Sequence, residues 1–307
     1  MKKTFAAFFT AVFLISAHVA GAAPLATQAP PVPAVEQTQP AVPSVRASTI
    51  ADVFAGERMV YRIGFWFFDN VAEGSISLEK EADGTYTGTL EAHTTGSVRR
   101  IILDRKDTYV SRMRLSEDGQ RFIPVGFEKT VDKNGKVRRG TTVFDYEKHV
   151  MTWKSWGGGK EERGGEVAFP EDITPYDPVT AFYNLRYGVY GPLEKGKEFT
   201  IYSFPKEDRV PRISVRIATE DEMGRMPEPV ADKAAYLAFA RIDKELFGST
   251  SGDIEIYFTG EMVPVYAVAK DILFFGDIRG TLTRSVAGGV GNVEKAGSSR
   301  AIASSAR

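Results

Sequence analysis

Histidine is the side chain most often used for acid–base catalysis and metal binding at neutral pH, and this chain has only three. His18 lies in an apolar N-terminal segment, which leaves His93 and His149, in separate predicted strands, for such chemistry. Two isolated histidines make a Ser-His-Asp triad or a His-rich metal site difficult to assemble. The sequence also lacks cysteine, which excludes disulfides, thiolate nucleophiles and Cys-ligated metals. We therefore expect a protein without enzymatic activity, cofactor or metal ion.

Two glycine-rich segments approach known catalytic motifs without completing them. Residues 248–252 have the outline of a nucleophile elbow, but Thr250 stands where the motif needs serine, and a strand is expected to follow. Residues 157–160 begin like a phosphate-binding loop, but Glu161 replaces the Ser or Thr that would contact magnesium. Both segments are therefore predicted to be turns.

Acidic residues leave one catalytic alternative open, because cleavage of a glycosidic bond needs only two carboxyl groups at a suitable separation. No signal selects a particular pair. Glu91 and His93 on one strand face could supply half of a metal site, although a plain polar face is the favoured interpretation. The acids available for a catalytic pair are Asp69, Glu73, Asp104, Asp107 and Asp177.

Four residues are candidates for ligand binding. Arg186 extends the apolar stripe of a predicted helix that includes Tyr183, so its guanidinium is expected inside the fold. A buried guanidinium requires a carboxylate or several carbonyls, which makes Arg186 either a clamp to the sheet, the favoured interpretation, or a ligand anchor. Phe65 and Phe67 belong to an apolar run that either fills the core, again favoured, or lines a ligand cavity.

A basic hairpin is a further binding candidate. Since neighbouring residues of a strand point to opposite faces, some of its cations would share a face suited to an anionic glycan or lipid head group. The favoured interpretation is a solvated hairpin that protects a sheet edge. Its charged residues are Lys129, Lys133, Lys136, Arg138 and Arg139, with Asp132 as the opposing charge.

Most of the chain alternates between apolar and polar residues with a period of two, as strands with one buried face do. Asn134-Gly135 is a strong hairpin signal, and a second turn is expected at Asp69-Asn70, after the aromatic run. We predict a mainly β fold: a single rolled or barrel-like antiparallel meander. Its strands are expected near 59–67, 72–79, 85–94, 108–115, 122–131, 136–144, 149–155, 198–204, 211–218, 234–243, 252–258, 263–270 and 277–284.

One segment, about 178–187, is predicted to be an α-helix packed on the open side of this sheet. Asp177 can accept hydrogen bonds from the first turn, and Pro178 suits the first helical position. Gly188 can end the helix. These features give Asp177 and Pro178 structural rather than catalytic roles.

The two ends of the sequence have different compositions from the centre. Residues 1–22 combine Lys2 and Lys3, an apolar run and small residues at 20–22, which predicts a cleavable signal peptide without a lipoprotein cysteine. We expect a Pro-rich disordered linker over 23–48, an all-β domain over 49–286 and a disordered tail over 287–307. The protein is therefore expected in the periplasm, with no membrane span after cleavage.

The formal net charge argues against nucleic acid as a partner. It is −1 for the whole chain and would be −3 without Lys2 and Lys3, whereas nucleic-acid-binding proteins normally carry an excess of basic residues.

Several short segments occur in a fixed order along the chain: GERMVY at 56–61, AEG at 72–74, DP at 177–178, AFYNLR at 181–186, VPV at 263–265, and FGD at 275–277 with Leu282. In this order and spacing they resemble the exported bacterial family catalogued as domain of unknown function 3108. The resemblance would span roughly 55–285 and implies a rolled β architecture and an envelope location. It implies no established activity and no catalytic residues, and the polar stretch 219–233 has no clear place in the family pattern.

These observations favour a non-enzymatic periplasmic envelope protein that binds a lipid, glycolipid or other amphiphile in a curved β-sheet. A first alternative is an assembly module of an envelope complex, with the Pro-rich arm as a tether and an envelope protein as its partner. A second is a carbohydrate-active enzyme that uses two carboxylates.

Overall fold

The computed structural model describes residues 48–96, 104–158, 160–205, 211–224, 226–242, 250–272 and 276–289. The predicted signal peptide, nearly all of the Pro-rich linker and most of the predicted tail lie outside the described residues. So do Gly248 and Ser249 of the glycine-rich segment 248–252. The domain boundaries at 49 and 286 therefore stay predictions.

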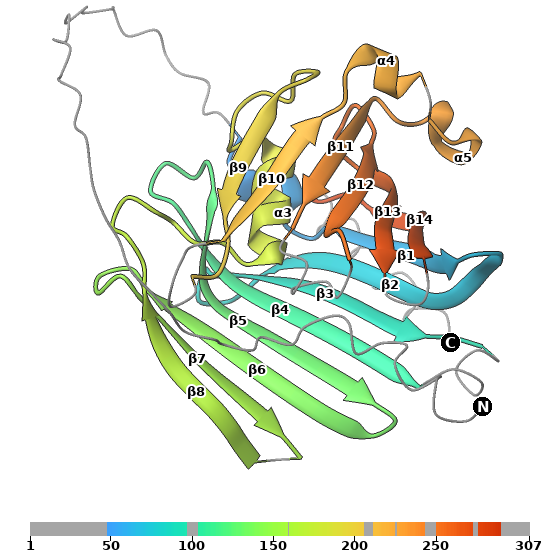
Figure 1. Ribbon diagram of the computed structural model, residues 1–307. Coiled ribbons are helices and arrows are strands. Elements are labelled where there is room, and N and C mark those ends of the chain that lie inside the picture. The colour runs from blue at the N-terminus through green and yellow to red at the C-terminus, as the bar shows by residue number, and fades with distance from the viewer. Residues whose placement is uncertain are drawn as a thin grey trace, which may run out of the picture.

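The described strands form one antiparallel sheet of 14 strands (Figure 1). This confirms the prediction of a mainly β fold built as a rolled antiparallel meander. The first half of the sheet contains β1 (Arg58–Phe65), β2 (Phe68–Lys80), β3 (Tyr86–Thr94), β4 (Arg105–Leu115), β5 (Phe122–Lys133), β6 (Lys136–Asp145), β7 (Val150–Gly157) and β8 (Lys160–Ala168). The second half contains β9 (Glu198–Tyr202), β10 (Arg212–Ile217), β11 (Tyr236–Arg241), β12 (Asp253–Phe258), β13 (Pro264–Ile272) and β14 (Gly276–Val286).

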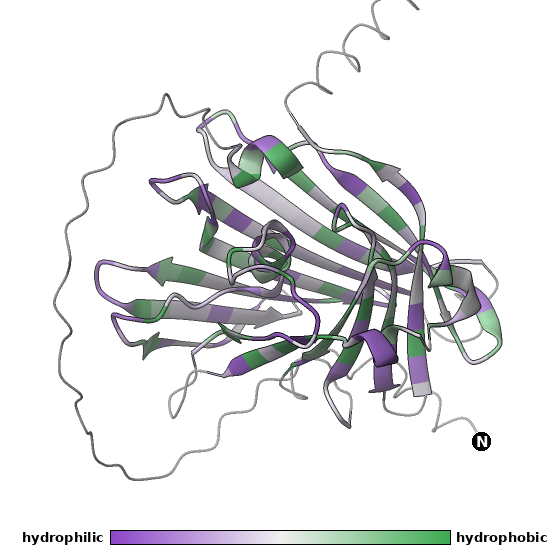
Figure 2. Cartoon of the chain, turned by 90° about the horizontal axis from the view of Figure 1, so that it is seen from above, coloured by the Kyte–Doolittle hydropathy of each residue, from purple (hydrophilic) through white to green (hydrophobic). Residues whose placement is uncertain are grey.

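The first and last strands lie side by side in the middle of the sheet, because β1 pairs with both β2 and β14. The two edges are β8 and β9, which are consecutive in the chain but not paired. The segment that connects them contains helix α3 (Pro178–Tyr187), which lies between the two halves of the curved sheet (Figure 2). We call the side of the sheet on which α3 packs the inner face.

Helix α3 begins and ends where the sequence predicts. The Asp177 carboxylate accepts hydrogen bonds from the backbone N–H groups of Val179 and Thr180, and Pro178 occupies the first turn. Gly188 ends the helix with a φ of 84°, a left-handed conformation that favours glycine. The buried side of α3 then packs on β3, β4 and β5, and Tyr183 contacts the aromatic rings of Phe54 and Phe122.

Three short helices accompany α3. Helix α1 (Ile50–Phe54) precedes β1 and carries a capping box formed by Thr49 and Asp52. Helices α4 (Glu220–Met223) and α5 (Glu228–Ala231) occupy the polar insertion 219–233. Buried Val230 of α5 belongs to the same apolar cluster as Tyr257 and Tyr266, so this insertion covers part of the outer face of the second half.

Two predictions about the strands need correction. Strand β8 was not predicted, because its sequence KEERGGEVA is polar and lacks alternation; an edge strand can tolerate such a sequence. The turn expected at Asp69-Asn70 lies instead at Trp66-Phe67, so the predicted strand stops at Phe65, which pairs with Phe68. By contrast, Asn134-Gly135 forms the predicted hairpin, with φ values of 52° and 77°.

Candidate binding sites

Arg186 forms a buried ion pair with Glu57, the residue before β1. The NH1 and NH2 groups donate to the two carboxylate oxygens at 2.6 and 2.7 Å, and Nε donates to the Met262 carbonyl at 2.7 Å. Arg186 is only 4% exposed, and its guanidinium carbon lies 4.5 Å from the centre of the Phe54 ring. This geometry is that of the predicted clamp, which ties α3 to both halves of the sheet.

The four predicted ligand-binding residues lie in three places, since only Tyr183 and Arg186 are neighbours, with the Arg186 guanidinium 5.7 Å from the Tyr183 ring centre. Tyr183 is buried in the core beneath α3, and Arg186 is held by Glu57. Phe65 is buried in a separate cluster with Val71, Ala72 and Ile272. Phe67 lies on the β1–β2 turn and is 77% exposed. The four candidates are thus not brought together at one place, and the turn at Trp66-Phe67 moves Phe67 out of the strand.

Asp177 is completely buried and has four hydrogen-bond donors around it. Besides the two backbone N–H groups of α3, the hydroxyls of Ser111 and Thr180 donate to Oδ2 at 2.7 and 2.5 Å. Burial raises the pKa of the Asp177 carboxyl, and these hydrogen bonds oppose the shift. The carboxyl group is thus fully used in fixing the start of α3 to β4.

The hairpin β5–β6 carries the predicted cations on two different faces. The pairs Lys129↔Gly140, Val131↔Arg138 and Lys133↔Lys136 place four of the cations on one side of the sheet. Tyr109, which pairs with Lys129, and Ser111, which contacts α3, lie on this same side, so it is the inner face. Arg139 points to the outer side, where it forms an ion pair with Glu128.

Two residues of β4 join these cations. Arg105 pairs with Lys133 across the sheet, and Asp107 with Val131. The buried Arg105 guanidinium donates to both carboxylate oxygens of Asp107, at 2.6 and 2.7 Å. We call this group the inner basic face. It consists of Arg105, Asp107, Lys129, Lys133, Lys136 and Arg138.

The cations of the inner basic face are close enough to disfavour one another's charge. Burial lowers the pKa of Lys129 to about 7; Asp107 opposes this shift and Arg105 adds to it. Burial also lowers the pKa of Lys133, and the positive charges of Arg105 and Arg138 lower it further. Five cations therefore gather around one carboxylate, which creates a positive potential on this side of the sheet.

Apolar side chains continue the inner face from these cations towards α3. Tyr109 stacks near Phe127, with ring centres 6.3 Å apart, and Phe127 in turn contacts Phe204. Leu90, which pairs with Tyr109, is 36% exposed although it lies on the inner side. Tyr109 and Phe127 are buried, and Leu90 is the one of these three side chains that offers apolar surface to solvent beside the positive charges.

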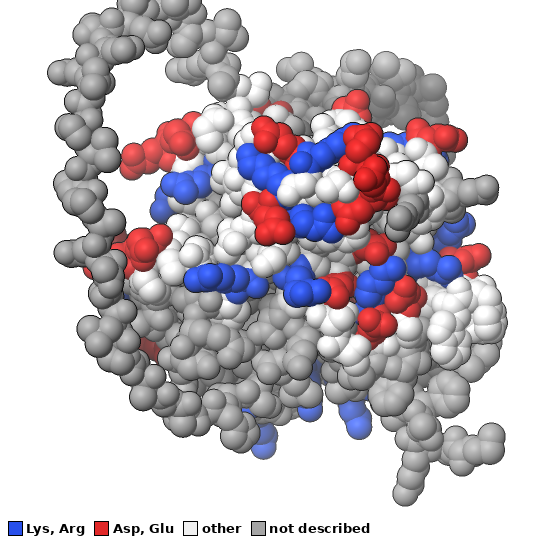
Figure 3. Space-filling view, turned by 45° about the horizontal axis from the view of Figure 1, so that its top comes forward, with Lys and Arg blue, Asp and Glu red and all other residues white. Residues whose placement is uncertain are grey.

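Charges elsewhere on the molecule are mostly arranged in pairs of opposite sign. Arg216 meets Glu222 at 2.7 Å, and Arg241 meets Asp253 at 2.7 Å. Basic and acidic side chains accordingly alternate across the surface in Figure 3. The inner basic face differs from this background by its excess of one sign.

Sequence reasoning identified the hairpin but missed its partners on β4. Arg105 lay before the predicted strand 108–115, so its position on the inner face was not recognised. The strand begins three residues earlier, and its alternation then places Arg105, Asp107 and Tyr109 on one side. The signal available in the sequence was the alternation itself, which could have been extended back from Tyr109 to Asp107 and Arg105.

The structure also shows where the other segments with candidate chemistry lie. Residues 157–160 lie at the β7–β8 hairpin, where Gly157 pairs with Lys160, as predicted for a turn. Glu91 lies 2.8 Å from Lys106 and 4.0 Å from His93. Within the described ranges, no group of three or more His, Asp or Glu residues is arranged to hold a metal ion. None of the described helices has the length and apolar character needed to cross a membrane.

Comparison with known proteins gives a family without a known activity. No curated protein matches the chain. A solved structure, described as a beta-barrel-like protein of domain of unknown function DUF1849 from Brucella abortus, is 15% identical and covers 77% of this chain and 99% of its own, with a TM-score of 0.39. The model of the family described as protein of unknown function (DUF3108) matches residues 60–283. The chain therefore belongs to the DUF3108 family, as the sequence resemblance predicts.

Proposed function

We propose that this protein is an exported, non-enzymatic envelope protein that binds an anionic amphiphile on its inner basic face. The observation that carries the proposal is the gathering of five cations near Asp107 on the inner face, beside Leu90, whose side chain is exposed to solvent. The proposal of export rests on the signal-like residues 1–22.

The ligand class follows from the positive charges of the inner basic face and from the apolar side chains beside them. A positive potential favours an acidic head group, since a neutral one would leave the repulsion among Arg105, Lys133 and Arg138 in place. The neighbouring apolar side chains favour a hydrocarbon portion, because burying apolar area contributes about 25 cal/mol per Å². A lipid or glycolipid with an acidic head group satisfies both requirements.

The chain offers a matched pair of variants for testing this proposal. Arg138 and Arg139 are neighbours in β6, but only Arg138 belongs to the inner basic face. We expect Arg138→Gln to weaken binding of short-chain phosphatidylglycerol about tenfold, whereas Arg139→Gln leaves it unchanged. Isothermal titration calorimetry with the full chain measures both affinities, and short-chain phosphatidylcholine is the neutral control ligand.

The outcomes separate the proposal from its rivals. Equal binding of the anionic and neutral lipids, or equal loss in both arginine variants, would contradict the proposed site. Binding of inorganic phosphate with the same affinity as the lipid would show that the hydrocarbon portion contributes nothing. Crosslinking in cells tests the assembly alternative: a stoichiometric protein partner that is lost on deletion of 23–48 would favour an assembly module instead.

A further inference from the structure

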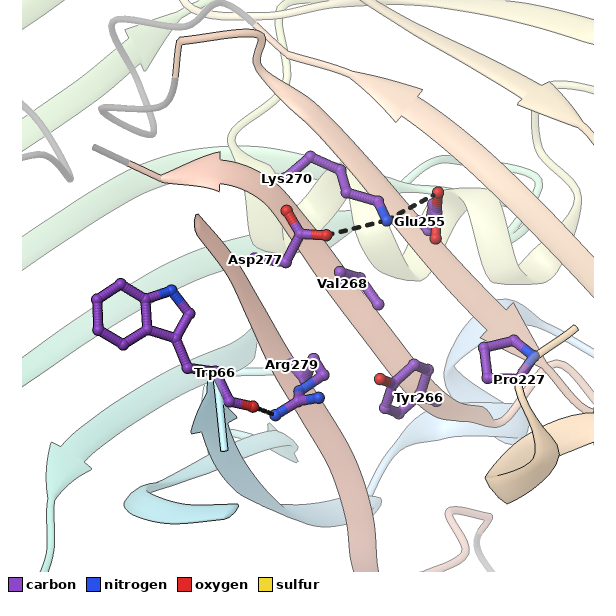
Figure 4. Close-up of a pocket in the computed structure, with 8 residues that line it drawn as sticks. All are labelled: Trp66, Pro227, Glu255, Tyr266, Val268, Lys270, Asp277 and Arg279. Atoms are coloured by element: carbon purple, nitrogen blue, oxygen red, sulfur yellow. Dashed lines mark hydrogen bonds and ion pairs between the residues drawn. The ribbon is translucent and has the colours of Figure 1, made fainter. Parts of the chain in front are cut away.

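A pocket of about 250 Å³ lies on the side of the sheet opposite to the inner basic face (Figure 4). We call it the outer pocket. Its walls come from the β1–β2 turn and from β12, β13 and β14, far from the inner basic face. Trp66 stands at one end and Tyr266 lies towards the other. The residues that matter for its chemistry are Trp66, Glu255, Tyr266, Lys270, Asp277 and Arg279.

Trp66 is held in an unusual conformation. Its φ of 49° lies in the left-handed region, which a bulky residue rarely adopts, yet its side chain is largely exposed, at 58% for the residue. The Arg279 guanidinium donates a hydrogen bond to the Trp66 carbonyl, and the indole Nε1 lies 3.3 Å from where a Cβ on Gly276 would be. The positive φ suits the tight two-residue turn between β1 and β2, and this turn together with β14 places an aromatic ring at the edge of the pocket.

The polar side chains of the outer pocket are charge-balanced. Lys270 Nζ lies 3.3 Å from Glu255 Oε1 and 3.2 Å from Asp277 Oδ2. Burial works against the ammonium charge, but Asp277 and Glu255 outweigh it and raise the pKa of Lys270. With Arg279 as the second cation, two positive and two negative groups face the pocket, and the formal charge is zero.

This combination excludes two classes of ligand. An ion would gain little from a site without net charge, and it would have to displace one partner of the Lys270 network. An apolar molecule would remove water from Lys270, Glu255 and Asp277 without replacing its hydrogen bonds, which is unfavourable. A neutral molecule rich in hydroxyl groups avoids both difficulties.

We infer that the outer pocket binds a neutral saccharide, with Trp66 against the C–H face of a sugar ring and Glu255, Asp277, Lys270 and Arg279 hydrogen-bonded to its hydroxyls. Carboxylates accept from hydroxyls and the two cations donate to them, so charge-assisted hydrogen bonds can form around one ring. The cavity is smaller than the sites of drug-sized ligands, which suits one or two sugar units. This site is independent of the proposed amphiphile site.

Saturation-transfer NMR with the full chain tests this inference directly. The probes are methyl glucoside, methyl galactoside and N-acetylglucosamine, with glucuronate and glucosamine as charged controls and cyclohexanol as an apolar control. We expect at least one neutral sugar to show transfer, strongest at the protons of one ring face, and the three controls to show none. Titration calorimetry then gives the affinity of that sugar.

Variants assign the binding to this pocket. Trp66→Ala should weaken the sugar affinity about tenfold, whereas Phe67→Ala, which removes a still more exposed ring from the same turn but outside the pocket lining, should leave it unchanged. Asp277→Asn should also weaken it, because the amide cannot hold Lys270 by charge. Arg138→Gln serves as the control for the inner basic face. The inference is overturned if no neutral sugar binds, if a charged control binds better, or if Trp66→Ala and Phe67→Ala behave alike.

Discussion

Beneath α3, the Arg186 guanidinium and the Glu57 carboxylate meet at 2.6 and 2.7 Å and leave no charge unbalanced. On the same side of the sheet, the inner basic face gathers five cations near Asp107. The first region uses charge to fix the position of a helix. The second keeps like charges together, which lowers stability unless an anion balances them. The contrast distinguishes a structural use of charge from a binding surface.

The largest change in the free energy of unfolding should follow from removing one partner of the Glu57–Arg186 ion pair. Glu57→Gln is expected to lower the free energy of unfolding by about 4 kcal/mol, because the Arg186 charge stays buried without its carboxylate. Urea unfolding followed by circular dichroism measures this. The double variant Glu57→Gln, Arg186→Met should recover much of the loss. A loss below about 1 kcal/mol in the single variant would show that the pair is not a clamp.

Replacing Lys129 is expected to have a smaller effect of opposite sign on the free energy of unfolding. Its folded pKa is about 7 against an ordinary value of 10.5, so between these pH values the unfolded chain binds more protons and stability rises with pH. Lys129→Met removes this dependence and should raise the free energy of unfolding by about 2 kcal/mol at pH 7, a gain that vanishes near pH 10.5.

Urea unfolding from pH 7 to 10.5 tests the Lys129 prediction. Lys106→Met is the matched control, since Lys106 lies on the outer side of β4 beside Glu91. A pH-independent gain in Lys129→Met, or the same pH dependence in the control, would assign the effect to packing rather than to the suppressed charge.

The smallest effect concerns repulsion within the inner basic face. Lys133→Gln should raise the free energy of unfolding by about 0.5 kcal/mol at low salt, because it relieves the repulsion from Arg105 and Arg138. The gain should disappear in 1 M sodium chloride, where the Debye length is about 3 Å. Arg139→Gln should give no gain, since Arg139 is paired with Glu128. A gain that persists at high salt would mean that the cations do not interact.

The sequence predicted most elements because their signals are local. Alternation marks the strands, Asn134-Gly135 the hairpin, and Asp177 with Pro178 the start of α3. The Trp66-Phe67 turn was missed because bulky aromatic residues rarely occupy a left-handed conformation, so their presence favours a strand. A buried position for Arg186 was predictable from helical spacing.

The partners of the buried charges were harder to predict, because they depend on contacts distant in the sequence. Glu57 lies 129 residues from Arg186, and nothing in the local pattern connects them. The outer pocket likewise combines the β1–β2 turn with β12–β14, so its existence depends on which strands are neighbours. In this meander, most neighbouring strands are also consecutive in the sequence, so their pairing is predictable from local signals. The pairing of β1 with β14 joins strands that are distant in the sequence and is not predictable in that way.

The pairing of β1 with β14 has a consequence for the order in which the protein can be made. Arg58 aligns with Val286, so the central ladder of the sheet cannot close until the final strand is available. Contacts of such sequence separation slow folding, because a long loop must be closed before they form. A chain still emerging from a ribosome therefore keeps one edge of β1 open, and the central ladder is completed only when β14 arrives.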